Sequence, residues 1–161
     1  MTTEIHLDTT TISTLNLTPA RAAIEPVLNG ASLPEVEQSL QFSIDFSRDP
    51  SDPRELSEIP EIRLWFVRLD ASYPWLPLLL DWQNGELARY TAMLVPHEFH
   101  PTEGIQYNPE ALEIFLMNKI FTIAEWLAER GLPSRSRVQS MAQMLGYDLD
   151  DGLFDLLLSQ V

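Results

Sequence analysis

The residues with the most obvious capacity for chemistry are two histidines in the segment PHEFHPTE. His97 and His100 lie three positions apart, with Glu98 and Glu103 beside them, and zinc binds imidazole and carboxylate groups of this kind. The pair lacks the H-E-x-x-H spacing of a metalloprotease helix, because only two residues separate the histidines. No third strong ligand stands nearby in the sequence. We therefore expect a polar loop that follows a strand and binds no metal or other cofactor.

Two pairs of carboxylates could in principle perform acid–base chemistry: Asp70 with Asp81, and Asp81 with Glu86. Because Asp81 and Glu86 flank a predicted turn, we expect them to be solubilising surface charges. The chain has no cysteine, which excludes thiol catalysis and metal or iron–sulfur ligation by its own thiolates. It also has no glycine-rich phosphate loop and no G-x-S-x-G elbow. The sequence therefore favours a protein that is not an enzyme.

Lys119 is the only lysine in the chain. On a helical wheel it falls between Leu112 and Trp126, on the apolar side of a predicted helix. Its ammonium group either reaches the surface along its apolar stem or pairs with a buried carboxylate such as Asp70 or Asp81. A catalytic amine with a lowered pKa is a further alternative, and we favour the structural roles.

The net charge limits the kinds of partner. Ten basic and 24 acidic residues give a formal charge of −14 at pH 7, which repels nucleic-acid backbones and anionic membrane surfaces. Half of that deficit lies in residues 1–60, and a partner drawn to them would be basic. The alternative is that the acidity only keeps the protein in solution.

The N-terminal segment MTTEIHLDTTTIST has neither the basic and apolar regions of a signal peptide nor the arginines of a transit peptide. No window reaches the roughly 18 apolar residues that a membrane-spanning helix needs. We therefore expect a protein that does not insert into membranes.

Hydrophobic patterning predicts the elements that position these residues. Residues 4–8 and 39–48 are expected to be strands, the second with alternating apolar and polar side chains. A capped helix is expected over residues 18–29, and an irregular acidic loop over residues 49–61. The run IRLWFVRLD, residues 62–70, has apolar residues at both odd and even positions. This pattern predicts a strand that is buried on both faces.

An Asn-Gly pair at residues 84–85 is the strongest turn signal, because a type I′ turn needs two positive φ angles. It predicts a β-hairpin with strands over residues 76–82 and 87–95. After it, an asparagine and a proline begin a long, mostly apolar helix over residues 109–131. Two shorter helices are expected to follow.

This order of elements predicts the fold class α+β. We expect a mostly antiparallel sheet of about four to five strands, a long buried helix packed across it and short C-terminal helices. At 161 residues, 45% of them hydrophobic, the chain is expected to form a single domain over residues 1–161.

The segment RLDASYPWLP is the best candidate for a protein-binding surface. Tyrosine, tryptophan and arginine dominate interface hot spots, although the aromatic rings could instead belong to the core. With two residues from later in the chain, the candidate partner-binding residues are Arg68, Asp70, Tyr73, Pro74, Trp75, His97 and Lys119. A rival hypothesis is a small-molecule-binding domain or enzyme with a pocket around Asp70, Tyr73, His97 and Lys119.

Residues 60–155 also resemble a known family. The segments YPWLP, LLDW, GELARY, MLVPH and NPEALE, with MNK behind them, are similar to those of the chlororespiratory reduction 6 family of cyanobacteria and plant chloroplasts. The acidic residues 1–60 carry little of this pattern.

The resemblance implies an assembly factor. Members of that family help to build the hydrophilic arm of the photosynthetic NAD(P)H dehydrogenase-like complex and are associated with its ferredoxin-like iron–sulfur subunit. The chain would then be a soluble, non-catalytic chaperone whose partner is that subunit. The absence of a transit peptide looks like a cyanobacterial, cytoplasmic member, whereas plant relatives belong to the chloroplast stroma. The resemblance supplies no catalytic residues, and the oligomeric state is left open.

Overall fold

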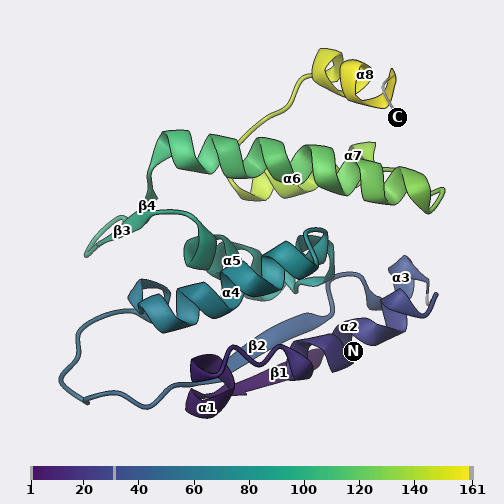
Figure 1. Cartoon of the computed structure of the whole chain (residues 1–161). Helices are drawn as coiled ribbons and strands as arrows, with labels where there is room; N and C mark the ends of the chain where they lie inside the picture. The colour runs from purple at the N-terminus through teal and green to yellow at the C-terminus, as the bar shows by residue number, and fades with distance from the viewer. Residues whose placement is uncertain (1, 31, 160–161) are drawn as a thin grey trace. The chain divides into compact units, whose positions relative to one another are not determined.

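A computed structural model describes residues 2–30 and 32–159 of the chain (Figure 1). It divides into two compact units, residues 1–94 and residues 95–161, and each is described by itself. The expectation of a single domain stays a prediction. Within the described ranges, no helix combines the length and the apolar character needed to cross a membrane.

The first unit is built on two parallel strands. Strand β1 (Thr3–Asp8) pairs with β2 (Leu40–Asp45), so that Ile5 lies opposite Phe42. Both predicted strands are confirmed, and Leu40 and Phe42 are buried as the alternation of β2 requires. A parallel pair needs a crossover connection, and here that connection contains α1 (Thr9–Ser13), α2 (Thr18–Leu28) and α3 (Leu33–Val36).

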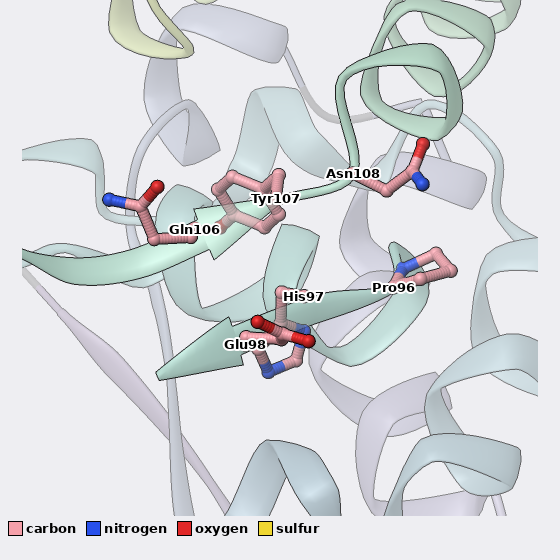
Figure 2. A pocket seen from close by; sticks show the side chains of 6 residues that line it. All are labelled: Pro96, His97, Glu98, Gln106, Tyr107 and Asn108. Carbon is pink, nitrogen blue, oxygen red and sulfur yellow. The ribbon is translucent and has the colours of Figure 1, made fainter. Parts of the chain in front are cut away.

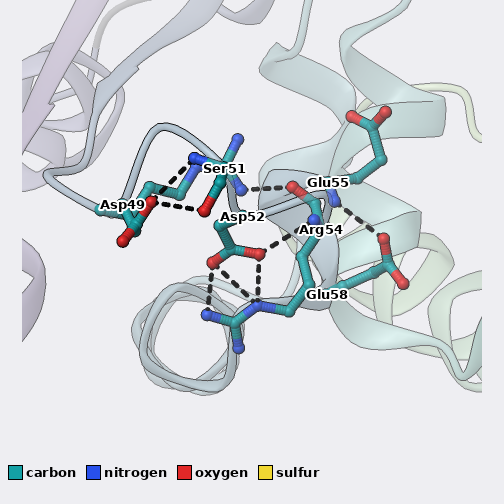
Figure 3. Close-up of polar contacts among 7 residues, drawn as sticks. Asp49, Ser51, Asp52, Arg54, Glu55 and Glu58 are labelled. Atoms are coloured by element: carbon teal, nitrogen blue, oxygen red, sulfur yellow. Dashed lines mark hydrogen bonds and ion pairs between the residues drawn. The ribbon is translucent and has the colours of Figure 1, made fainter.

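The acidic loop after β2 is held by its own side chains (Figure 3). The Asp49 carboxylate accepts hydrogen bonds from the Ser51 amide at 2.8 Å and from the Ser51 hydroxyl at 2.6 Å. The Arg54 side chain donates to Asp52 at 2.7–3.1 Å and lowers the pKa of that carboxyl to about 2. The short 3₁₀ helix η1 (Leu56–Glu58) follows, and Glu55 and Glu58 form a capping box at its N-terminus. Several carboxylates of the loop therefore have structural partners.

The predicted strand over residues 62–70 is wrong, because this run lies in helix α4 (Pro60–Ser72). Its buried side chains, Ile62, Trp65, Phe66 and Leu69, stand at the i, i+3, i+4 and i+7 spacing of one helix face. Pro60 occupies the first turn, where its missing N–H costs no hydrogen bond. The two remaining apolar residues of the run, Leu64 and Val67, lie outside this face and are 48% and 47% exposed.

The predicted β-hairpin at Asn84-Gly85 is also wrong. The chain forms 3₁₀ helices η2 (Leu76–Leu79) and η3 (Trp82–Asn84), followed by α-helix α5 (Glu86–Leu94). Gly85 does adopt a positive φ of 79°, but Asn84 does not, so the I′ turn is not formed. Instead Asp81 caps η3, accepting hydrogen bonds from the Asn84 amide at 3.2 Å and from its side chain at 2.7 Å.

Aromatic rings form the centre of the first unit. Phe42 of β2 contacts Trp65 and Phe66 of α4 edge-to-face, with centroids 6.2 Å and 4.9 Å apart. Phe66 in turn meets Tyr90 of α5 at 6.0 Å. Trp65, Phe66 and Tyr90 are at most 1% exposed. The sheet and the two helices therefore share one core, which aromatic pairs of this geometry stabilise.

The second unit consists of a β-hairpin and three helices. Strands β3 (His97–His100) and β4 (Gly104–Tyr107) pair antiparallel, so the expected loop at PHEFHPTE is wrong. The predicted helices are confirmed as α6 (Pro109–Glu129), α7 (Arg135–Met144) and α8 (Asp151–Ser159). Asn108 caps α6, accepting a hydrogen bond from the Ala111 amide at 3.0 Å.

The predicted fold class therefore needs correction. The chain is α+β, but its described residues hold eight α-helices and two sheets of two strands each, one parallel and one antiparallel. A mostly antiparallel sheet of four to five strands does not form, because the residues assigned to its central strands form α4 and α5. Helix α6 consequently has no such sheet to cross, and it packs against α7 within its own unit.

Candidate partner-binding site

The seven residues predicted for partner binding divide between the two units. Arg68, Asp70, Tyr73, Pro74 and Trp75 form one stretch at the end of α4 in the first unit. His97 lies on β3 and Lys119 on α6 in the second unit. The first five are therefore brought together by chain continuity.

The aromatic side chains of this stretch point into the core. Tyr73 and Trp75 are each 7% exposed, and their rings meet edge-to-face with centroids 5.9 Å apart. The Arg21 side chain donates to the Tyr73 hydroxyl at 3.2 Å. Arg68 is exposed and Pro74 half-buried. The burial favours a core role for both rings, and their docking role stays a prediction.

Asp70 takes part in a structural contact. The Tyr90 hydroxyl donates a hydrogen bond to its carboxylate at 2.7 Å. Burial, with the Asp70 charge as the next cause, raises the pKa of Tyr90 well above its usual value. A phenol held in its neutral form is a stable donor at every physiological pH, so the pair fastens α4 to α5.

A buried charged cluster at the start of α5 was missed by the sequence reasoning. Asp81 and Glu86 are 7% and 6% exposed, so their assignment as solubilising surface charges is wrong. Arg89 donates to the Phe42 carbonyl at 2.7 Å and to the Glu86 carboxylate at 3.3 Å. Arg89 thus blocks part of the free edge of β2. The Glu86-x-x-Arg89 spacing, which places the two side chains on one helix face, is the signal that could have revealed it.

Glu86 is the least satisfied member of this cluster. One of its carboxylate oxygens is buried and has no hydrogen-bond partner among the described residues. Burial raises the pKa of Glu86, opposed by the nearby Arg89 charge. Asp81 differs, because the hydrogen bond from the Asn84 side chain, ahead of that from Gln41, lowers its pKa.

His97 lines a cavity on the β-hairpin of the second unit, with a volume of about 360 Å³ (Figure 2). We call it the hairpin pocket, and its lining residues are Pro96, His97, Glu98, Gln106, Tyr107 and Asn108. His97 and Tyr107 are opposite each other in the register, with ring centroids 6.0 Å apart. Burial raises the pKa of Tyr107 to about 12, so its hydroxyl stays neutral. The TEG turn, with Gly104 at φ 76°, is the signal that could have predicted this hairpin.

The hairpin pocket suits hydrogen bonding better than metal binding. The His97 Nδ1 atom lies 2.9 Å from the Val95 carbonyl oxygen, which can only accept, so Nδ1 carries the proton. In the described part of the chain, no three His, Asp or Glu side chains are grouped so that they could hold a metal ion. The pocket also contains none of Asp70, Tyr73 and Lys119, the other residues of the small-molecule hypothesis.

Lys119 is 1% exposed, which contradicts the alternative in which its ammonium group reaches the surface. Its Nζ atom lies 5.7 Å from the centroid of the Phe115 ring, one helical turn away. Such cation–π contacts stabilise a partly desolvated ammonium group. The burial favours an interior role for Lys119, and its partner-binding role stays a prediction.

Comparison with known proteins adds one match. The family model described as "Chlororespiratory reduction 6" matches residues 7–156, nearly the full chain. No solved structure matches the chain.

Proposed function

The chain belongs to the chlororespiratory reduction 6 family, and we propose that it acts as a non-catalytic assembly factor that binds a subunit of its target complex. The family has a role in assembling the photosynthetic NAD(P)H dehydrogenase-like complex. The observation that carries the proposal is the family match over residues 7–156. It extends the resemblance noted for residues 60–155 into the acidic N-terminal part.

The proposed partner is the ferredoxin-like iron–sulfur subunit of the hydrophilic arm. The formal charge of −14 supports a protein partner over nucleic acid or an anionic membrane. The non-catalytic role is supported by the ionisable groups of the first unit: Asp70, Asp81 and Glu86 each contact a structural side chain. We expect the protein to act in the cytoplasm of a cyanobacterial cell, as plant relatives would in the stroma.

The outer face of α4 is the part of the candidate stretch that can reach a partner. Leu64 and Val67 are about half exposed, and Arg68 is exposed next to them. A small apolar patch with an arginine at its rim has the composition of an interface hot spot. We propose that this face, rather than the rings of Tyr73 and Trp75, contacts the iron–sulfur subunit.

The test is complementation of a deletion strain. The wild-type gene is expected to restore the complex on native gels, and tagged protein to capture the iron–sulfur subunit during assembly. Val67→Asp combined with Arg68→Glu should abolish capture and reduce the complex. Leu28→Asp is the matched control, since Leu28 and Val67 are each 47% exposed. Normal assembly in the deletion strain would refute the function, and normal capture by the α4 variant would refute the surface.

A further inference from the structure

An apolar groove lies on the second unit, between the first turns of α6 and the segment that leaves α7. We call it the α6 groove; its volume is about 600 Å³ and its lining residues are Glu113, Ile114, Leu116, Met117, Tyr147 and Leu149. Four of these six side chains are aliphatic or thioether groups. Ile114 is 71% exposed, the highest value among the large apolar side chains described. Exposed apolar surface of this kind marks interaction sites.

Both walls of the groove are fixed by helix-end structures. Asn108 caps the start of α6, which holds the helix face that carries Ile114. At the end of α7, Gly146 has φ 91°, and the Tyr147 amide donates to the Ala142 carbonyl at 2.9 Å. This is a Schellman motif, which sets the direction of the following residues. A groove with preformed walls loses little entropy when it is filled.

The two wall segments of the groove carry only negative charges. The wall segments, residues 109–117 and 147–151, contain five acids and no lysine, arginine or histidine; the acids are Glu110, Glu113, Asp148, Asp150 and Asp151. All five are exposed. One rim acid already has a cationic partner: the Arg135 guanidinium of α7 pairs with Asp151 at 3.0 Å and with Asp155 of α8 at 2.8 Å. A second copy of this chain would bring like charges together, so it is a poor occupant.

We propose that the α6 groove binds a basic amphipathic helix of a partner protein. Its apolar side chains would cover Ile114, Met117 and Leu149, and its lysines or arginines would meet the acidic rim. This is the helix-in-groove mode of recognition, with anchors at i, i+3, i+4 and i+7. The inference rests on the proposed function only in taking the partner to be a protein.

The test uses the full chain and a synthetic helical peptide with Leu at i, i+3, i+4 and i+7 and Lys elsewhere. Binding is measured by fluorescence anisotropy, with a scrambled peptide of the same composition as a control. Ile114→Asp should weaken binding by roughly tenfold or more, because an isoleucine that the bound peptide would cover is replaced by a charge. Phe121→Asp is the matched control on α6: Phe121 is 49% exposed but does not line the groove. It should change binding by less than about twofold.

A second measurement needs no variant. With ¹³C-methyl methionine, the Met117 signal should shift on peptide addition, whereas Met93, 1% exposed in the first unit, should not. Equal binding of the scrambled peptide, equal effects of Ile114→Asp and Phe121→Asp, or no binding at all would overturn the proposal. Dimerisation lost only in Ile114→Asp would assign the groove to a second copy. If the peptide binds but Ile114→Asp supports normal assembly in cells, the assembly function stands and the groove has no part in it.

Discussion

Truncation of Trp75 tests most directly whether the aromatic turn after α4 belongs to the core. Trp75 and Tyr73 are each 7% exposed and contact each other edge-to-face. Trp75→Ala should therefore lower the free energy of unfolding by about 3–5 kcal/mol, since buried aromatic rings leave cavities when truncated. Tyr73→Phe keeps the ring and loses only the hydrogen bond from Arg21, so it should cost about 1 kcal/mol.

The assay is urea unfolding followed by circular dichroism, because Trp75→Ala removes a fluorophore. Tyr73→Ala and the double variant complete a cycle, in which the ring contact should appear as a coupling of about 0.5–1.5 kcal/mol. Pro74→Ala is the control for truncation within the same turn, because Pro74 lies between the two buried rings in the sequence but is itself only half-buried. If Trp75→Ala cost less than about 1 kcal/mol with an unchanged spectrum, the ring would not be core, and the docking role would regain support.

Three further changes test the turn and the buried charges. Gly85→Val should cost about 1–2 kcal/mol in thermal unfolding, because φ is 79°, whereas Gly85→Asn should cost less; equal costs would contradict the backbone argument. Burial raises the pKa of Glu86, so ionisation of this carboxyl lowers the stability of the folded protein as the pH rises. Glu86→Gln, which cannot ionise, should therefore raise the melting temperature at pH 7; a lower melting temperature would contradict this. The pKa of Asp81 is lowered, so its carboxylate contributes stability above its unfolded pKa that is lost as the pH falls through the folded pKa. Asp81→Asn should therefore destabilise at pH 7 and flatten the acid limb of the stability curve; an unchanged acid limb would refute that assignment.

The sequence predicted the elements whose ends carry specific capping residues. Helix α6 begins at the Asn108 cap, as expected, and ends at Glu129, two residues before the predicted limit. Gly131, with φ 69°, closes it in the same Schellman pattern that Gly146 gives α7. Strand β2 was found because its alternation is complete over its length. Local signals were sufficient wherever they specified both the type and the end of an element.

The secondary-structure prediction failed at two segments, where the local pattern predicted strands that the folded protein does not form. IRLWFVRLD is short and apolar on both parities, and such a run fits a buried strand or a helix equally well. The spacing of Ile62, Trp65, Phe66 and Leu69 was present but was masked by Leu64 and Val67. Asn84-Gly85 supplied one positive φ rather than two, and Asp81 then used Asn84 as a capping partner.

Three of the predicted site residues are more buried than a docking surface requires. Tyr73, Trp75 and Lys119 were singled out because aromatic and charged groups are conspicuous, yet each is at least nine-tenths buried. The segments that carried the family resemblance, YPWLP and LLDW, supply a continuous buried run from Trp75 to Trp82. Packing in the first unit is therefore sufficient to explain why these segments are apolar, and their part in partner binding stays a prediction. The two surfaces that we propose for partner binding are the α4 face around Val67 and Arg68 in the first unit and the acidic α6 groove around Ile114 in the second. Because the two surfaces differ in charge, high salt should weaken capture through the groove far more than capture through α4, and a salt series on the two sets of variants separates their contributions.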